Sequence, residues 1–208
     1  MNRKALKEKS KDQLREQWGT AAITTLVYTL LLTAITVVPV VGSIIATIVG
    51  PVFGFGLLYY FLLIARDQKP SVSDIFAGFS NFIPIIIASI LISLFTFLWS
   101  LLFIIPGIIA GYKYCFTLYA LADDPDLSAL QAIRRSKELT NGYKFDIFVL
   151  QFSFFGWMFL SAITCGVAAL WAIPYMSVAM ANYYEAAKEA KDPDYVDVDY
   201  EDVEQVEA

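Results

Sequence analysis

Three long stretches without a charged residue restrict the folds open to this chain. They run from residue 17 to 65, from 75 to 112 and from 147 to 184. A membrane hydrocarbon core about 30 Å thick is crossed by about 20 apolar residues in a helix, so each stretch has room for two crossings. The backbone must satisfy its own hydrogen bonds in that layer, and the alternating pattern of a β-barrel strand is absent. The sequence therefore predicts an all-α, polytopic membrane protein.

Turn signals divide these stretches into six predicted membrane-spanning helices. The spans are residues 21–38, 43–65, 82–104, 107–122, 147–164 and 167–184. Turns without charge separate the two members of each pair, at residues 38–42, 105–107 and 165–166. Pro51 and Pro174 fall inside the second and sixth spans, where proline kinks or breaks a helix. Gly50 and Gly54 form a face of small residues in the second span, a pattern typical of close helix packing.

The positions of the basic residues predict how these spans are oriented. Apart from Lys113, every lysine and arginine lies before the first span, in the loops 66–81 and 123–146, or just after the last span. Cytoplasmic loops of membrane proteins carry an excess of these residues. The N-terminus, both long loops and the C-terminus are therefore predicted to be cytoplasmic, so that the protein consists of three helical hairpins.

Polar segments flank the predicted transmembrane domain of residues 20–190. Residues 1–19 hold six basic and three acidic side chains, with Leu6, Leu14 and Trp18 on one helical stripe. Two interpretations stay open: an amphipathic helix at the membrane surface with its lysines toward lipid headgroups, or a solvated helix that leads into the first span. Residues 191–208 contain eight acidic side chains and are predicted to be a disordered cytoplasmic tail.

The second long loop contains a predicted amphipathic helix at about residues 127–140. Asp126 is the expected N-cap, and Asn141-Gly142 supplies a left-handed stop. Leu127, Leu130, Ile133 and Leu139 form its apolar face.

Basic side chains are the candidate sites for contact with an anion or a lipid. Arg134, Arg135 and Lys137 lie on the polar face of the loop helix, and Lys144 follows it. These four residues either bind lipid phosphates or form an ordinary solvated surface. Lys113 lies inside the fourth span, and a charge within a membrane marks a functional site by default. The alternative is that its amine reaches the outer interface, about 9 Å along the helix.

Several motifs between Ile105 and Tyr184 resemble a family of bacterial membrane proteins, the domain of unknown function 975. They are PGII, a Tyr-Lys-Tyr, a Tyr-Ala-Leu-Ala-Asp-Asp-Pro, an Ala-Ile-x-x-Ser that ends in Asn-Gly, a Phe-Gly-Trp and a late Pro-Tyr. The opening Asn-Arg-Lys-x-Leu-Lys and Trp18-Gly19 are also similar to that family. The resemblance implies a bacterial membrane protein with this architecture, and it implies no particular biochemical activity.

Signatures of an enzyme are missing from the sequence. There is no histidine, no GxSxG motif, no P-loop and no carboxylate pair inside a span. Asp123, Asp124 and Asp126 lack the glycine and the terminal glutamate of a calcium loop, so we interpret them as helix-capping and turn residues. We therefore expect no catalytic residue, metal or cofactor.

Two hypotheses for the function follow from these observations. The first is a non-enzymatic protein of the bacterial cytoplasmic membrane that acts through contacts with membrane lipids or with a protein partner, and not with nucleic acid. The second is a small transporter or channel-like protein. It would use Lys113 and helix breaks at Pro51 and Pro174, because discontinuous helices line transporter sites. A water-accessible cavity bordered by those breaks would distinguish the second from the first.

Overall fold

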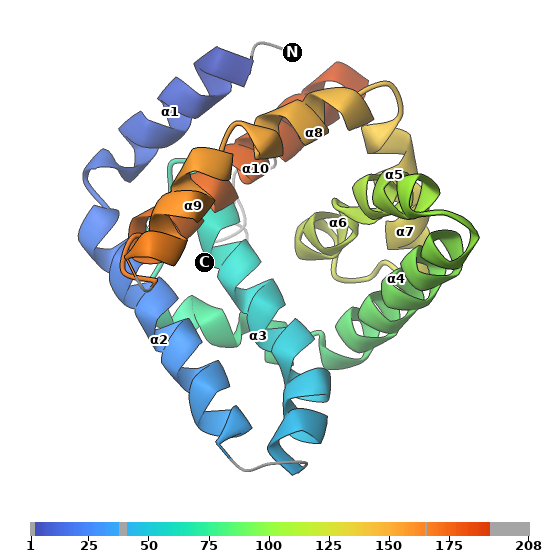
Figure 1. The fold of residues 1–208 in the computed structure, drawn as a ribbon, viewed down its shortest axis with the longest axis horizontal. Coiled ribbons are helices and arrows are strands. Elements are labelled where there is room, and N and C mark those ends of the chain that lie inside the picture. The colour runs from blue at the N-terminus through green and yellow to red at the C-terminus, as the bar shows by residue number, and fades with distance from the viewer. Residues whose placement is uncertain (1–2, 38–40, 165, 192–208) are drawn as a thin grey trace, which may run out of the picture.

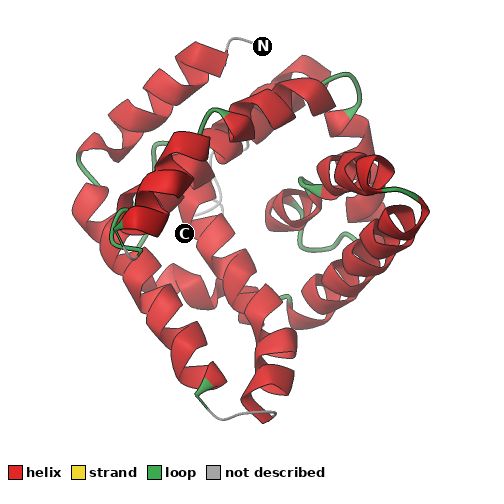
Figure 2. Cartoon of the chain, viewed as in Figure 1, coloured by secondary structure: helices red, strands yellow, loops and turns green. Residues whose placement is uncertain are grey.

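The structure, a computed structural model, describes residues 3–37, 41–164 and 166–191. These residues are helical almost throughout and contain no strand, which confirms the all-α class (Figure 2). The elements are α1 (Arg3–Arg15), α2 (Trp18–Thr36), α3 (Val41–Ala65), the 3-10 helix η1 (Val72–Phe79), α4 (Phe82–Leu102), α5 (Ile104–Tyr114), α6 (Thr117–Asp123), α7 (Ala129–Thr140), α8 (Lys144–Phe152), α9 (Phe155–Ile163) and α10 (Ala169–Lys191). The predicted acidic tail lies outside the described residues.

Among the described residues, four helical segments are long and apolar enough to cross a membrane: Trp18–Thr36, Ile44–Ala65, Phe82–Leu101 and Lys144–Ile163. Only 11–17% of the apolar stretch is buried in three of them, compared with 56% in α3. Helix α3 accordingly lies inside the fold and contacts α2, α4, α6, α10 and η1 (Figure 1). Long helices that leave large apolar side chains uncovered fit a membrane protein, because such surfaces face lipid.

The predicted fourth span is not one helix. Residues 107–122 are divided between α5 and α6, with the break at Cys115 and Phe116. Ser136 of α7 lies at this break: its hydroxyl donates to the Lys113 carbonyl (2.8 Å) and accepts from the Phe116 amide (3.1 Å). A side chain that inserts into the backbone ladder in this way interrupts a helix. The prediction of one continuous helix was wrong because the residue that interrupts it, Ser136, lies 20 positions after the break.

The helix breaks within the predicted spans do not fall at the proline residues. Helices α3 and α10 continue through Pro51 and Pro174, so the predicted breaks at those two residues are wrong. The predicted fifth span is instead divided between α8 and α9, at Ser153 and Phe154. The Ser153 hydroxyl accepts a hydrogen bond from the ammonium of Lys7 (3.0 Å), so a residue of α1 reaches this break.

The loop helix α7 begins two residues later than predicted. Its N-cap is Ser128, whose hydroxyl accepts from the Gln131 amide while the Gln131 side chain accepts from the Ser128 amide (2.8 Å). This capping box corrects the prediction of Asp126 as the N-cap. The predicted stop is confirmed, since Gly142 has a φ of 88°. Helix α7 also packs inward: Ile133 is buried in a cluster with Ala110 and Tyr114 of α5, and side chains from the middle of α4 pack against this cluster.

Helix α1 docks on the protein rather than only on a membrane surface. Ser10 and Leu14 are fully buried against the rest of the fold. The ammonium of Lys7 lies 4.4 Å from the ring centre of Phe154, and that of Lys11 lies 5.7 Å from the ring of Tyr175. Cation–π contacts of this kind attach a basic helix to aromatic rings. Lys7 and Lys11, which the membrane-surface interpretation places toward lipid headgroups, thus contact aromatic rings of the protein.

The closest contact of the second span with another helix is at Gly56, which does not belong to the small-residue face of Gly50 and Gly54. A Cβ at Gly50 would have open space around it, and one at Gly54 would touch only the hydroxyl of Tyr28 at 3.9 Å. A Cβ at Gly56 would overlap the backbone carbonyl of Ile75 in η1. The loop helix η1 therefore packs directly on the backbone of α3.

Candidate functional site

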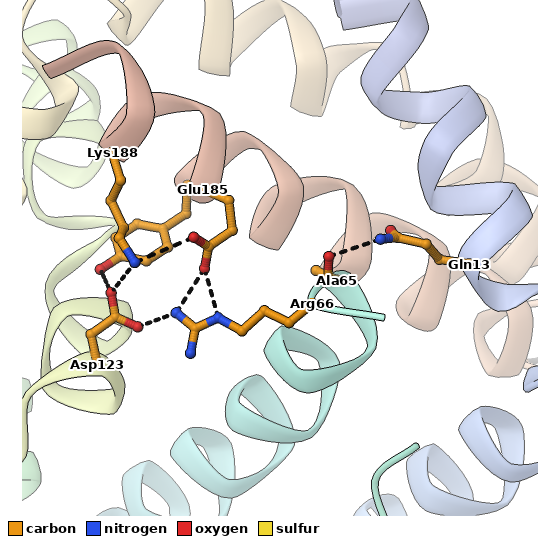
Figure 3. A network of polar contacts seen from close by, with 7 residues as sticks. Gln13, Ala65, Arg66, Asp123, Glu185 and Lys188 are labelled. Carbon is orange, nitrogen blue, oxygen red and sulfur yellow. Dashed lines mark hydrogen bonds and ion pairs between the residues drawn. The ribbon is translucent and has the colours of Figure 1, made fainter. Parts of the chain in front are cut away.

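The C-terminal end of α3 places Arg66 inside the fold. The Arg66 amide still donates to the Leu62 carbonyl (3.1 Å), whereas the next residue, Asp67, has a positive φ of 59° and turns the chain away. The side-chain amide of Gln13 in α1 fixes this end, because it donates to the Ala65 carbonyl (2.8 Å) (Figure 3). It also donates to the Asp67 carboxylate (3.1 Å). The helix end is thus held by the N-terminal helix.

Four charged side chains meet there, drawn from three helix ends (Figure 3). The guanidinium of Arg66 donates from Nε (3.0 Å) and from a terminal nitrogen (2.8 Å) to Glu185 of α10, and it also donates to Asp123 of α6. The ammonium of Lys188 lies 2.8 Å from the other Asp123 oxygen and 3.3 Å from Glu185. The hydroxyl of Tyr184 donates to Asp123 (2.6 Å). We call Arg66, Asp123, Glu185 and Lys188 the ion cluster.

The ion cluster is neutral as a whole and well buried. The side chain of Lys188 is 3% exposed, that of Asp123 10%, and those of Arg66 and Glu185 14% each. Burial alone lowers the pKa of Arg66 and raises that of Asp123, but the opposite charges outweigh it. The pKa of Arg66 is therefore raised and that of Asp123 lowered, the latter chiefly by Arg66 and then by Lys188. The pKa of Lys188 is raised for the same reason, through Asp123. Arg66, Asp123 and Lys188 therefore stay charged at neutral pH.

Acid should weaken the fold through Asp123. Because the pKa of this carboxyl is lowered in the folded protein, the unfolded chain binds more protons near its ordinary value of 3.8. The stabilisation by Asp123 is present above that value and is lost as the pH falls below it. We expect the melting temperature to fall in this range, and the fall to be smaller in Asp123→Asn, which has no carboxyl to titrate. Melting curves in detergent from neutral to acid pH test this. Asp126→Asn, which removes an exposed carboxyl of the same loop, should show the same fall in melting temperature as the wild type.

A cavity of about 420 Å³ opens beside the ion cluster. Helices α6, α7 and α10 and the loop between α6 and α7 contribute its walls, through Ala120, Asp123, Asp124, Leu127, Gln131, Arg134, Arg135, Glu138, Tyr184 and Lys188. Both signs of charge face it. Since Asp123 and Lys188 belong to the ion cluster, the floor of the cavity is a fixed array of charge, while Arg134 and Asp124 are exposed.

Two of the five basic residues predicted from the sequence line this cavity. They are Arg134 and Arg135, and Arg135 lies 3.8 Å from Glu138 on the same helix. Lys137 is elsewhere, with its ammonium 5.6 Å from the ring centre of Tyr114. Lys113 is also separate: its ammonium lies 5.2 Å from the ring of Trp99 in α4. The structure therefore does not bring the predicted residues into one site.

The three aspartates have different roles. Asp123 was interpreted as a capping or turn residue, which is wrong, since its carboxylate belongs to the ion cluster. Asp124 does hold the turn, because its side chain accepts from the Asp126 amide (3.0 Å). Within the described residues, no three His, Cys, Asp or Glu side chains are grouped so as to hold a metal ion.

Sequence reasoning missed Arg66, Glu185 and Lys188 because it treated them only as charges that flank a span. A signal was present. Arg66 and Glu185 are the first charged residues after two of the three uncharged stretches, and Asp123 directly follows the predicted fourth span. Opposite charges at ends that the topology places on one side of a membrane are candidates for an ion pair.

The transporter hypothesis required a cavity bordered by Pro51 and Pro174. The cavity beside the ion cluster is lined by neither, nor by Lys113. A smaller cavity of about 210 Å³ lies between α6, α8 and α10 and is likewise lined by none of these three residues. These two cavities do not support that hypothesis.

The model of the family described as "Protein of unknown function (DUF975)" matches residues 1–110 and 101–191. The chain belongs to the DUF975 family. The matched residues include α1, the helices long enough to span a membrane and every member of the ion cluster. No curated protein and no solved structure matches the chain.

Proposed function

We propose that this DUF975 protein crosses the bacterial cytoplasmic membrane six times, with both termini and the ion cluster on the cytoplasmic side. The ion cluster is the observation that carries this proposal. It joins the C-terminal ends of α3 and α6 to the last turns of α10, so these three ends must lie on the same side of the membrane.

The alternative of only four crossings conflicts with that contact. If α5 and α6 did not return across the membrane, Asp123 would remain beyond the far end of α4. A helix of 21 residues is about 31 Å long. Asp123 would then lie on the opposite side from Arg66, whereas the two side chains form an ion pair. Helices α5–α6 and α10 therefore serve as the fourth and sixth crossings, and the basic loops fall on the cytoplasmic side.

Within this topology, we propose a non-enzymatic role through contacts with lipid or with a protein partner. The oxygens of Asp123 are already bonded by two cations and a tyrosine, so this carboxylate has little capacity to act as a general base. The uncovered apolar faces of α2, α4 and α9 offer a large area for contact, and the cavity beside the ion cluster offers a polar one. Purification from the native membrane, followed by mass spectrometry of bound lipids and proteins, tests this role.

Cysteine labelling tests the topology directly. In a background with Cys115→Ala and Cys165→Ala, single cysteines at Lys69, Phe103, Glu138 and Val167 are probed in intact cells with a reagent that does not cross the membrane. Six crossings predict labelling at Phe103 and Val167 and protection at Lys69 and Glu138. Four crossings predict that Glu138 is labelled and Val167 protected, which would overturn the proposal.

A further inference from the structure

A groove of about 330 Å³ lies between α5 and the beginning of α8. Its walls are aliphatic or aromatic except for a single lysine: Ile108, Ile109, Tyr112, Lys144, Phe145 and Phe148. The rings of Tyr112 and Phe148 meet edge to face, with their centres 6.1 Å apart, and so connect the two walls. The groove is separate from the cavity beside the ion cluster, with which it shares no residue.

The apolar side chains of the groove leave much of their surface uncovered by protein. Phe145 is 74% exposed, and Ile108, Ile109 and Phe148 are 40–49% exposed. On a protein that spans a membrane, a hydrocarbon chain is the natural partner of such a surface, since lipid tails are as apolar as these side chains.

Lys144 adds a charge at one end of this apolar surface. No carboxylate of the described residues pairs with its ammonium. The nearest acidic residue in the sequence, Asp146, lies 3.3 Å from Arg3 and is already neutralised. A second cation is close, because the ammonium of Lys191 lies 5.7 Å from the ring centre of Tyr143, next to Lys144 in the chain. Basic side chains at the cytoplasmic surface attract anionic headgroups.

We propose that this groove binds one anionic phospholipid of the inner leaflet, with an acyl chain along the apolar walls and the phosphate at Lys144. Free phosphate would make no use of the apolar walls, so the occupant is a lipid. The inference rests on the proposed function, because the six-crossing topology places Lys144 at the cytoplasmic surface. It adds a location and a headgroup class to the general lipid contact.

Native mass spectrometry of the protein from nanodiscs with equal amounts of phosphatidylglycerol and phosphatidylcholine tests the site. The wild type should retain one phosphatidylglycerol. Lys144→Gln should lower its preference for that lipid about fivefold, the effect of one basic residue near an anionic surface. Ile109→Trp, which fills the groove, should reduce the retention of both lipids. Lys137→Gln is the matched control: it removes a lysine outside the groove and should leave the preference unchanged.

Three results would overturn the site. An unchanged preference in Lys144→Gln would reject the headgroup contact, and unchanged retention in Ile109→Trp would reject the groove. If the wild type carries no lipid but forms a dimer that Ile109→Trp dissociates, the occupant is a second copy of the chain. Failure of the topology is a separate result, because it appears in the cysteine labelling and leaves lipid retention intact.

Discussion

Replacing Arg66 with methionine should lower the free energy of unfolding by about 3–5 kcal/mol, the usual cost of removing one partner from a buried ion pair. The substitution keeps most of the apolar stem of the side chain. It leaves two buried carboxylates, Asp123 and Glu185, with Lys188 as the remaining cation of the cluster. Unfolding in mixed micelles, followed by circular dichroism over a series of denaturing-detergent fractions, gives the change in free energy.

Arg135→Met is the matched control for this prediction. Arg135 also faces the cavity and also lies near a carboxylate, but Glu138 is 60% exposed at its side chain. An exposed pair contributes about 0–1 kcal/mol, so this variant should be close to the wild type. The double variant Arg66→Met/Glu185→Met restores a neutral cluster and should be less destabilised than the sum of its single variants. Equal losses in Arg66→Met and Arg135→Met would show that the ion cluster does not hold the helix ends together.

Gly56→Ala should destabilise the protein by about 3 kcal/mol, at the upper end of the cost of overpacking a core. The new methyl group would overlap the Ile75 carbonyl, and a backbone atom has little freedom to move away. Helix η1 would have to separate from α3, which would also disturb the aromatic contacts of Phe53 with Phe76 and Phe79. The same unfolding titration in mixed micelles measures the loss.

Gly50→Ala is the control, in the same helix and with the same substitution. Apart from its two chain neighbours and the nearby backbone of α3 itself, no atom lies within 4 Å of the position that a Cβ would occupy at Gly50. Alanine is the better helix former by about 1 kcal/mol, but a Cβ on the residue before Pro51 is disfavoured in a helix, so the two effects offset each other and this variant should be close to the wild type. If Gly56→Ala and Gly50→Ala change the free energy of unfolding by the same amount, the packing of η1 on α3 does not depend on Gly56.

The sequence was sufficient to predict features that depend on local residues. Uncharged stretches indicated the long helices, and Asn141-Gly142 indicated where α7 ends, because glycine tolerates a positive φ. It was not sufficient where the cause is a distant residue. Ser136 divides α5 from α6 through hydrogen bonds across 20 and 23 positions. The contact of Arg66 with Glu185 spans 119 positions.

The same contrast between local and distant causes applies to the residues of the candidate site. Arg134 and Arg135 were found because a helical pattern puts both on the polar face of α7, which lines the cavity. Lys188 was missed because only the fold shows that its ammonium lies beside Asp123. Pro51 and Pro174 show the converse: proline alone favours a break, yet α3 and α10 continue through these two residues.

The contacts of α1 have a consequence for the order of events during synthesis. Asn182 of α10 donates hydrogen bonds to Ser10 and Gln13, which precede it by 172 and 169 residues. A ribosome makes α1 first and its partner last. Gln13 can already bond to the Ala65 carbonyl at the end of α3, but its bond to Asn182 and that of Ser10 cannot form until α10 has been made. The contacts between α1 and α10 therefore complete the docking of the N-terminal helix, and a chain that lacks α10 would lose them but keep the contacts of α1 with α2 and α3.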